Sequence, residues 1–262
     1  MRSTAVRRTV LAASATALAL LVTACGGSSD DGDKAGVGKA AGGRSTPVAP
    51  AAAKAMTAAE LEKAVLAQAD VKNGKVTEAA PSDDIPQDEV KAEKAECQPL
   101  VFAQTGVAAG EPAATVKRSW TEEAKKPAGD DVSEEALASA FDMDKLLVSL
   151  ASYEDGGAGT VLKDVNAAVS ACAGGFAYTA AGVRTRIDKV VADKAPAGAD
   201  DAVALTMTVA GEGGDKFPVK VTVTRKGATV ASFTVINLAS AATGEDFPFP
   251  TEISDAQLAK LG

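Results

Sequence analysis

Residues Val203–Val209 (VALTMTV) and Val219–Thr224 (VKVTVT) alternate larger apolar side chains with polar or small ones, position by position. A period of two places the apolar side chains on one face of a β-strand. Short connections that contain glycine, at residues 211–215 and Lys226-Gly227, follow the two runs, and a third apolar run spans Thr229–Leu238. Alternating runs joined by tight turns indicate antiparallel strands with one solvated face.

The rest of the folded region mixes helices with further strands. Thr57 and Glu60 have the spacing of a capping box, which predicts a helix start. Strands are expected at residues 75–80, 113–120, 143–153, 176–179 and 184–191, a loop at 125–131, and helices at 57–69, 98–105, 161–172 and 254–261. The predicted fold class is therefore α+β: an antiparallel sheet with three or four helices, in a single domain after a disordered tether.

The N-terminal region has the pattern of a lipoprotein leader. Three arginines precede an apolar run that is too short to span a membrane, and the run ends in Leu21–Cys25 (LVTAC). This is a lipobox pattern, in which cleavage precedes Cys25 and its thiol is acylated, for example with palmitate. The alternative is an ordinary secretory signal with a cysteine nearby. The export route, general or twin-arginine, stays open.

Three segments follow from this interpretation. Residues 1–24 are the expected signal peptide, residues 25–55 the lipidated cysteine and a disordered tether, and residues 56–262 the α+β domain. The tether is rich in Gly, Ala, Ser, Asp and Lys, a composition that cannot bury enough apolar surface to fold. The expected location is the extracytoplasmic face of the cell membrane, through the lipid anchor.

Charge and composition exclude several classes of function. The net charge is −8, and removal of a leader with three arginines would make it −11. A chain this acidic is not expected to bind nucleic acid. Histidine is absent, which removes catalysis by Ser-His-Asp or Cys-His sets and the commonest zinc ligand. The sequence predicts no catalytic residue, cofactor-binding residue or metal ligand, and the protein is not expected to be an enzyme.

The remaining cysteines, Cys97 and Cys172, are expected to form a disulfide. An oxidising compartment favours pairing once Cys25 is acylated. Cys172 ends the apolar stripe of its helix, and Cys97 begins a short helix whose apolar side can face inward. The alternative is two separately buried thiols.

Acid pairs and two aromatic residues are the other candidate site residues. The acid pairs are interpreted as solvated turns; they are Asp83-Asp84, Asp130-Asp131, Asp142 with Asp144, and Asp200-Asp201. For Asp200-Asp201 the alternative is a weak calcium site. Alternate prolines hold Phe247 and Phe249 on an extended backbone. The two rings either pack on the sheet or form an exposed ledge for a partner or ligand.

From Cys97 onward the order of features resembles the extracytoplasmic sensor domain of actinobacterial PknH-type receptor kinases and related lipoproteins. The similar features are Cys97 before Pro99-Leu100, the strand ending in Tyr153, the helix reaching Cys172, the Asp200-Asp201 turn, and the strands Val219–Arg225 and Thr229–Leu238. The resemblance implies an α+β sandwich with a cleft that binds or senses something in the envelope. Four cysteines would be needed for the two disulfides of some members, so a second disulfide is not expected here.

Together these features predict a non-catalytic ligand-binding or sensing module anchored to the membrane. The alternative is a structural or accessory envelope lipoprotein that contacts another protein. If the protein binds a ligand, we expect an apolar pocket between the inner face of the sheet and the helix Val161–Cys172. The ligand or partner in the envelope is not specified by the sequence.

Overall fold

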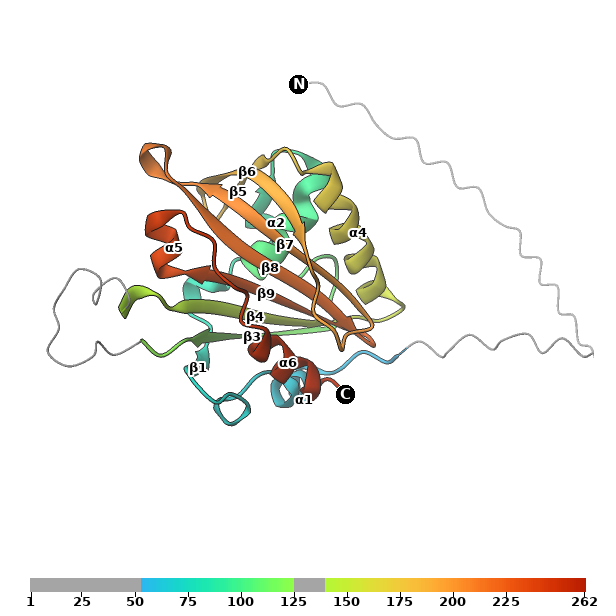
Figure 1. Ribbon diagram of the computed structural model, residues 1–262. Coiled ribbons are helices and arrows are strands. Elements are labelled where there is room, and N and C mark those ends of the chain that lie inside the picture. The colour runs from blue at the N-terminus through green and yellow to red at the C-terminus, as the bar shows by residue number, and fades with distance from the viewer. Residues whose placement is uncertain (1–52, 125–139) are drawn as a thin grey trace, which may run out of the picture. The chain divides into compact units, whose positions relative to one another are not determined.

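A nine-stranded antiparallel sheet forms the centre of the region that the structure describes (Figure 1). This computed structural model describes residues 53–124 and 140–262, which belong to one compact unit. Across the sheet the strands follow the order β1-β3-β4-β9-β8-β7-β6-β5-β2. Their bounds are Lys75–Glu78 (β1), Val90–Ala92 (β2), Ala114–Thr121 (β3), Asp144–Ser152 (β4), Phe176–Ala180 (β5), Val183–Asp193 (β6), Asp201–Ala210 (β7), Lys216–Lys226 (β8) and Thr229–Asn237 (β9).

The alternation that predicted β7 and β8 sets the two faces of the sheet. Met207 lies opposite Val219, and both are buried under helices on one face. Their neighbours Thr206 and Lys220 lie opposite each other and point to the other face. The sequence prediction of a mixed fold with an antiparallel sheet is therefore confirmed, although the sheet is larger than expected.

Helices α2 (Gln98–Thr105) and α4 (Gly157–Ala171) cover one face, which we call the α2/α4 face and which lies behind the sheet in Figure 1. Cys97 directly precedes α2 and Cys172 directly follows α4. The two residues are buried and form a disulfide with a Cα–Cα distance of 5.9 Å. The predicted disulfide is confirmed, and it fastens the two helices to each other above the sheet.

Helices α1 (Ala58–Ala64) and α6 (Thr251–Lys260) lie on the opposite face, which we call the α1/α6 face. Their core contains Leu61, Trp120, Leu146, Phe233 and Ile253. Gln257 of α6 is completely buried within it. Its Oε1 accepts the N–H of Leu66 at 2.7 Å, and its Nε2 donates to the carbonyl of Ala64 at 2.8 Å. These two bonds join α6 to the end of α1.

Several elements differ from the sequence prediction. The capping box of Thr57 and Glu60 is present, but α1 ends at Ala64 because Leu66 bonds to Gln257 instead of continuing the helix. Neither β2 nor α5 (Leu238–Thr243) was predicted, since both are short. The described residues thus contain five α-helices, α1, α2, α4, α5 and α6, rather than three or four.

Other predictions lie outside the described residues. They include the signal peptide 1–24, Cys25, nearly all of the tether 25–55, the loop 125–131 and the pair Asp130-Asp131. The domain boundaries therefore stay predictions. Across residues 53–124 and 140–262, no helix combines the length and apolar character needed to cross a membrane.

Candidate functional site

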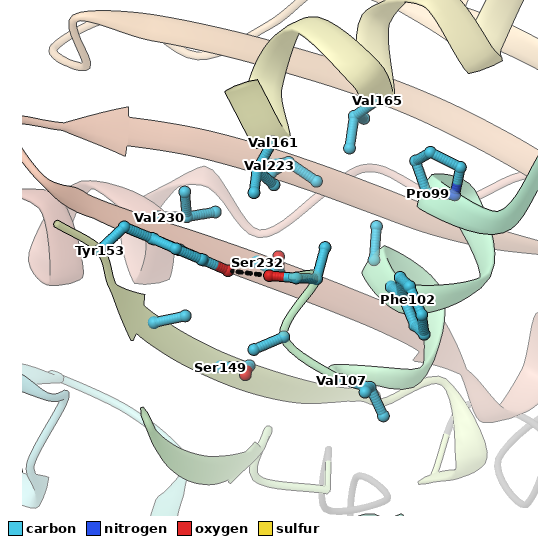
Figure 2. Close-up of a pocket in the computed structure, with 14 residues that line it drawn as sticks. Pro99, Phe102, Val107, Ser149, Tyr153, Val161, Val165, Val223, Val230 and Ser232 are labelled. Atoms are coloured by element: carbon cyan, nitrogen blue, oxygen red, sulfur yellow. Dashed lines mark hydrogen bonds between the residues drawn. The ribbon is translucent and has the colours of Figure 1, made fainter. Parts of the chain in front are cut away.

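A pocket lies at the place predicted between the sheet and the helix Val161–Cys172 (Figure 2), but side chains nearly fill it. Val161 and Val165 of α4 line it together with Val223 of β8, and Tyr153 lies along one side. The hydroxyl of Tyr153 donates to the carbonyl of Ala109 at 2.9 Å, and burial raises the pKa of this hydroxyl to about 12. The cavity measures about 20 Å³. That volume suits roughly one water molecule and no larger ligand.

A larger hollow lies on the α1/α6 face, across β6, β7 and β8. Its walls are the β6–β7 connection, including Lys194–Ala197, and the C-terminal segment with Phe249 and Thr251. This segment runs from α5 to α6 in front of the sheet in Figure 1. The hollow measures about 500 Å³, and a second hollow of about 320 Å³ shares Asp193 with it. We call the two together the β6–β8 groove; the larger is within the roughly 300–1,000 Å³ of ligand pockets.

A chain of polar side chains crosses the floor of the β6–β8 groove. The hydroxyl of Thr206 donates to Asp193 Oδ2 at 2.5 Å, and Lys220 Nζ donates to the same hydroxyl at 3.2 Å. Lys220 also forms an ion pair with Asp246 at 2.9 Å. Its hydrogen bond and positive charge lower the pKa of Asp246. The network connects three strands to the C-terminal segment and places one cation between two carboxylates.

The two rings expected either to pack on the sheet or to form an exposed ledge separate in the structure. Phe247 is 5 % exposed and lies beneath Lys220, whose Nζ is 5.4 Å from the ring centroid. Phe247 is therefore a packing residue, and the interpretation as an exposed ledge is wrong for it. Phe249 is partly buried, with its ring edge-on to Phe233 at a centroid distance of 6.5 Å, and it lines the β6–β8 groove. One of the two predicted residues thus contributes to a hollow.

The pair Asp200-Asp201 is a turn with its carboxylates already bound by protein groups. The guanidinium of Arg225 donates to Asp201 Oδ2 at 2.6 and 2.9 Å. The backbone N–H of Gly227 donates to Asp200 Oδ2 at 2.8 Å. Among residues 53–124 and 140–262, no three Cys, Asp or Glu side chains are grouped to hold a metal ion. In the pair Asp83-Asp84, the carboxylate of Asp83 accepts the backbone N–H of Ala80 at 3.1 Å.

The pair of Asp142 and Asp144 is not a solvated turn. The side chain of Asn237 donates through Nδ2 to Asp142 Oδ1 at 3.0 Å and to Asp144 Oδ1 at 2.9 Å. Asp144 is buried at the start of β4. Burial, together with the negative charges of Glu122, Asp142 and Glu252, raises the pKa of Asp144 to about 6, although the bond from Asn237 opposes the shift. The pair belongs to the β4–β9 junction.

Sequence reasoning missed the floor of the groove. Thr206 and Lys220 were recognised only as the polar positions of two alternating strands. Their cross-strand pairing could be inferred from the hairpin, but the contact with Asp246 depends on the path of the C-terminal segment, which no local pattern indicates. The groove offers hydrogen-bonding groups, one aromatic edge and small side chains such as Ala204, an arrangement suited to binding.

Comparisons with known proteins give only distant similarities. No protein-family model matches the chain, and no match was found among curated proteins. The extracellular domain of PknH from Mycobacterium tuberculosis is similar at 12% identity, over 79% of this chain and 95% of that chain, with a TM-score of 0.47. An uncharacterised protein from Mycobacterium smegmatis, an Rv0999 ortholog, is similar at 16% identity, over 73% and 90%, with a TM-score of 0.34. The lipoprotein part of the expected resemblance stays a prediction.

Proposed function

We propose that this protein is a non-catalytic binding or sensing module, held at the extracytoplasmic face of the membrane by a lipid on Cys25. The β6–β8 groove is its ligand site. The observation that carries the proposal is this hollow of about 500 Å³, with its polar floor and the ring of Phe249 in its wall. Export is supported by the disulfide of Cys97 and Cys172, since such bonds persist in oxidising compartments.

The chemistry of the groove supports binding rather than catalysis. Lys220 is already engaged by Thr206 and Asp246, and the chain has no histidine to serve as a base. A ligand that hydrogen-bonds to the floor and lays an apolar part against Phe249 matches both features of the groove. A floor of one cation between two carboxylates favours an uncharged polar ligand over a strongly charged one.

A substitution in the wall tests the site with a matched control. Ala197 is exposed and lines the groove, so Ala197→Trp should fill part of it without disturbing the core. Ala192 is exposed on the opposite face of β6, and Ala192→Trp adds the same side chain outside the groove. Native mass spectrometry of the full chain from its own host should show bound mass in the wild type and in Ala192→Trp. At least tenfold less should remain in Ala197→Trp, and equal occupancy in both variants would reject the groove as the site.

The second candidate function is an accessory lipoprotein that contacts another protein. It is favoured by the outer edge of β3 beside β1, part of which no strand covers among the described residues.

A further inference from the structure

β3 is paired along its whole length on one side but only along half of it on the other. All eight residues, Ala114–Thr121, pair with β4. On the outer side, β1 pairs only with Arg118–Thr121, and its ladder ends where Glu78 meets Arg118. Within the part of the chain that the structure describes, no strand pairs with the outer edge of residues 114–117. This half of β3 is therefore an open edge.

The hydrogen bonds show which backbone groups face this edge. In an antiparallel ladder, residues alternate between bonding to one neighbour and facing the other. Glu122 continues the β3–β4 register and donates its N–H to the carbonyl of Asp144 at 2.9 Å, so even-numbered residues bond to β4. The carbonyl of Lys117 accepts instead from the guanidinium of Arg118 at 2.8 Å. The backbone groups of Thr115 and Lys117 thus point outward.

β1 cannot cover this edge because of its own sequence. Continued in register, the chain after Glu78 would place Ala79 opposite Lys117 and Pro81 opposite Thr115. Proline has no N–H to donate to a ladder. The chain instead turns at Pro81 into a short 3-10 helix, whose Asp83 accepts the N–H of Ala80. The turn leaves a hollow of about 490 Å³ beside β3, lined by Glu78–Pro81, Asp84 and Thr115–Arg118.

We propose that this hollow binds an extended peptide segment of a partner protein, which adds about four residues in line with β1 as a tenth strand. β1 itself shows that an antiparallel strand fits against this edge of β3. Strand addition supplies main-chain hydrogen bonds, and the alternating side chains of the peptide supply specificity. The inference goes beyond the groove ligand and does not depend on it.

The surroundings define the chemistry of the peptide. Val116 points to the α1/α6 face and packs against its core, so the peptide residue beside it should be apolar. The lining of the hollow carries Glu78 and Asp84 against Lys117, while Arg118 is already paired with Glu62. This excess of acid favours lysine or arginine in the residues that flank the apolar one.

A second copy of the chain fits this edge poorly. Two β3 strands paired antiparallel about Val116 would place Pro112 of one copy opposite Trp120 of the other. That place is taken by Val76 of β1, which pairs with Trp120. A free peptide end or loop of another protein avoids the collision.

The test compares two substitutions at one position. Thr115→Pro removes the outward N–H, whereas Thr115→Ala keeps it and loses a similar part of the side chain. Phage-displayed random heptapeptides are selected on the biotinylated full-length chain, and the enriched peptides are then synthesised. We expect alternating apolar and basic sequences that bind the wild type and Thr115→Ala equally. Thr115→Pro should bind them at least tenfold more weakly, with thermal unfolding like that of Thr115→Ala.

Amide hydrogen exchange provides a measurement that does not require the proline variant to fold. The enriched peptide should slow exchange at Thr115 and Lys117 at least tenfold in the wild-type chain. The amide of Val116, which faces β4, should keep its rate. The proposal is overturned if selection yields no such peptides, if Thr115→Pro binds them as well as Thr115→Ala, or if protection falls elsewhere. A dimer seen by sedimentation that Thr115→Pro dissociates would assign the edge to a second copy instead.

Discussion

Cys97 and Cys172 lie 75 residues apart in the sequence, and their disulfide joins the start of α2 to the end of α4. Both helices pack on the same face of the sheet, so this one bond cross-links a layer that otherwise rests on side-chain packing and on hydrogen bonds to the sheet, such as the one from Thr234 Oγ1 to the carbonyl of Ala103. Its contribution can be measured directly.

The double variant Cys97→Ala/Cys172→Ala should lose about 4.5 kcal/mol in the free energy of unfolding, because the closed loop of 75 residues no longer restricts the unfolded chain. Urea unfolding of wild type and variant, with and without reductant, measures the difference. Reductant should destabilise the wild type and leave the double variant unchanged. Two alkylatable thiols in the unreduced, denatured wild type would contradict the bond.

Asp144 should make the protein less stable as the pH rises from about 4 to 6. Its pKa is raised from 3.8 to about 6 in the folded chain, so the folded state binds more protons than the unfolded state in this window. Asp144→Asn should flatten this slope and raise the free energy of unfolding at pH 7 by about 1–3 kcal/mol. The amide can still accept the bond from Asn237. Glu111→Gln, at an exposed acid, serves as the control, and a difference in stability between Asp144→Asn and the wild type that stays constant from pH 4 to 6 would refute the argument.

Gln257→Ala should destabilise the protein by about 2–4 kcal/mol, because it leaves the buried N–H of Leu66 and carbonyl of Ala64 without partners. Asp255→Ala, at an exposed position of the same helix, should change stability by less than about 0.5 kcal/mol. Thermal or urea unfolding distinguishes the two variants. A loss for Gln257→Ala as small as that of the control would mean that water replaces the side chain.

Cys25→Ser should abolish incorporation of labelled palmitate and release the protein from membranes or leave it unprocessed. The reason is that the thiol of Cys25 is the expected acylation site of the lipobox Leu21–Cys25. Membrane fractionation and metabolic labelling measure both effects, with Ser28→Ala as a control in the tether. Equal labelling of Cys25→Ser and wild type would disprove the lipid anchor.

Strong local patterns made much of the sheet predictable. Most of β7 and residues 219–224 of β8 alternate, and the glycine-containing turn between the two strands indicates an antiparallel order. β2 could not be found in this way, because its three residues, Val90–Ala92, have no pattern of their own and pair only with β5. The strand order, with β4 beside β9, depends on contacts between distant parts of the chain.

The candidate site was harder to predict than the fold. The buried state of Phe247 depends on Lys220 above it, and Lys220 is held by Asp246, so three local segments must be placed before the ring can be called buried. The predicted pocket beside Val161 is nearly filled, since Tyr153 and the residues around Phe102 occupy the space between helix and sheet. Whether a pocket remains between a helix and a sheet depends on the volumes of the side chains that meet there, and apolar periodicity in the sequence gives no information on how they fit together.

The place of β9 has a consequence for how the protein is made. This last strand of the sequence is the fourth across the sheet, between β4 and β8. A nascent chain that stops before Thr229 holds two unconnected sets of strands, whose facing edges, β4 and β8, are nine and eleven residues long and unpaired. Such edges aggregate readily. Synthesis must therefore reach the final strand before the sheet can close, and until then both long edges stay unpaired.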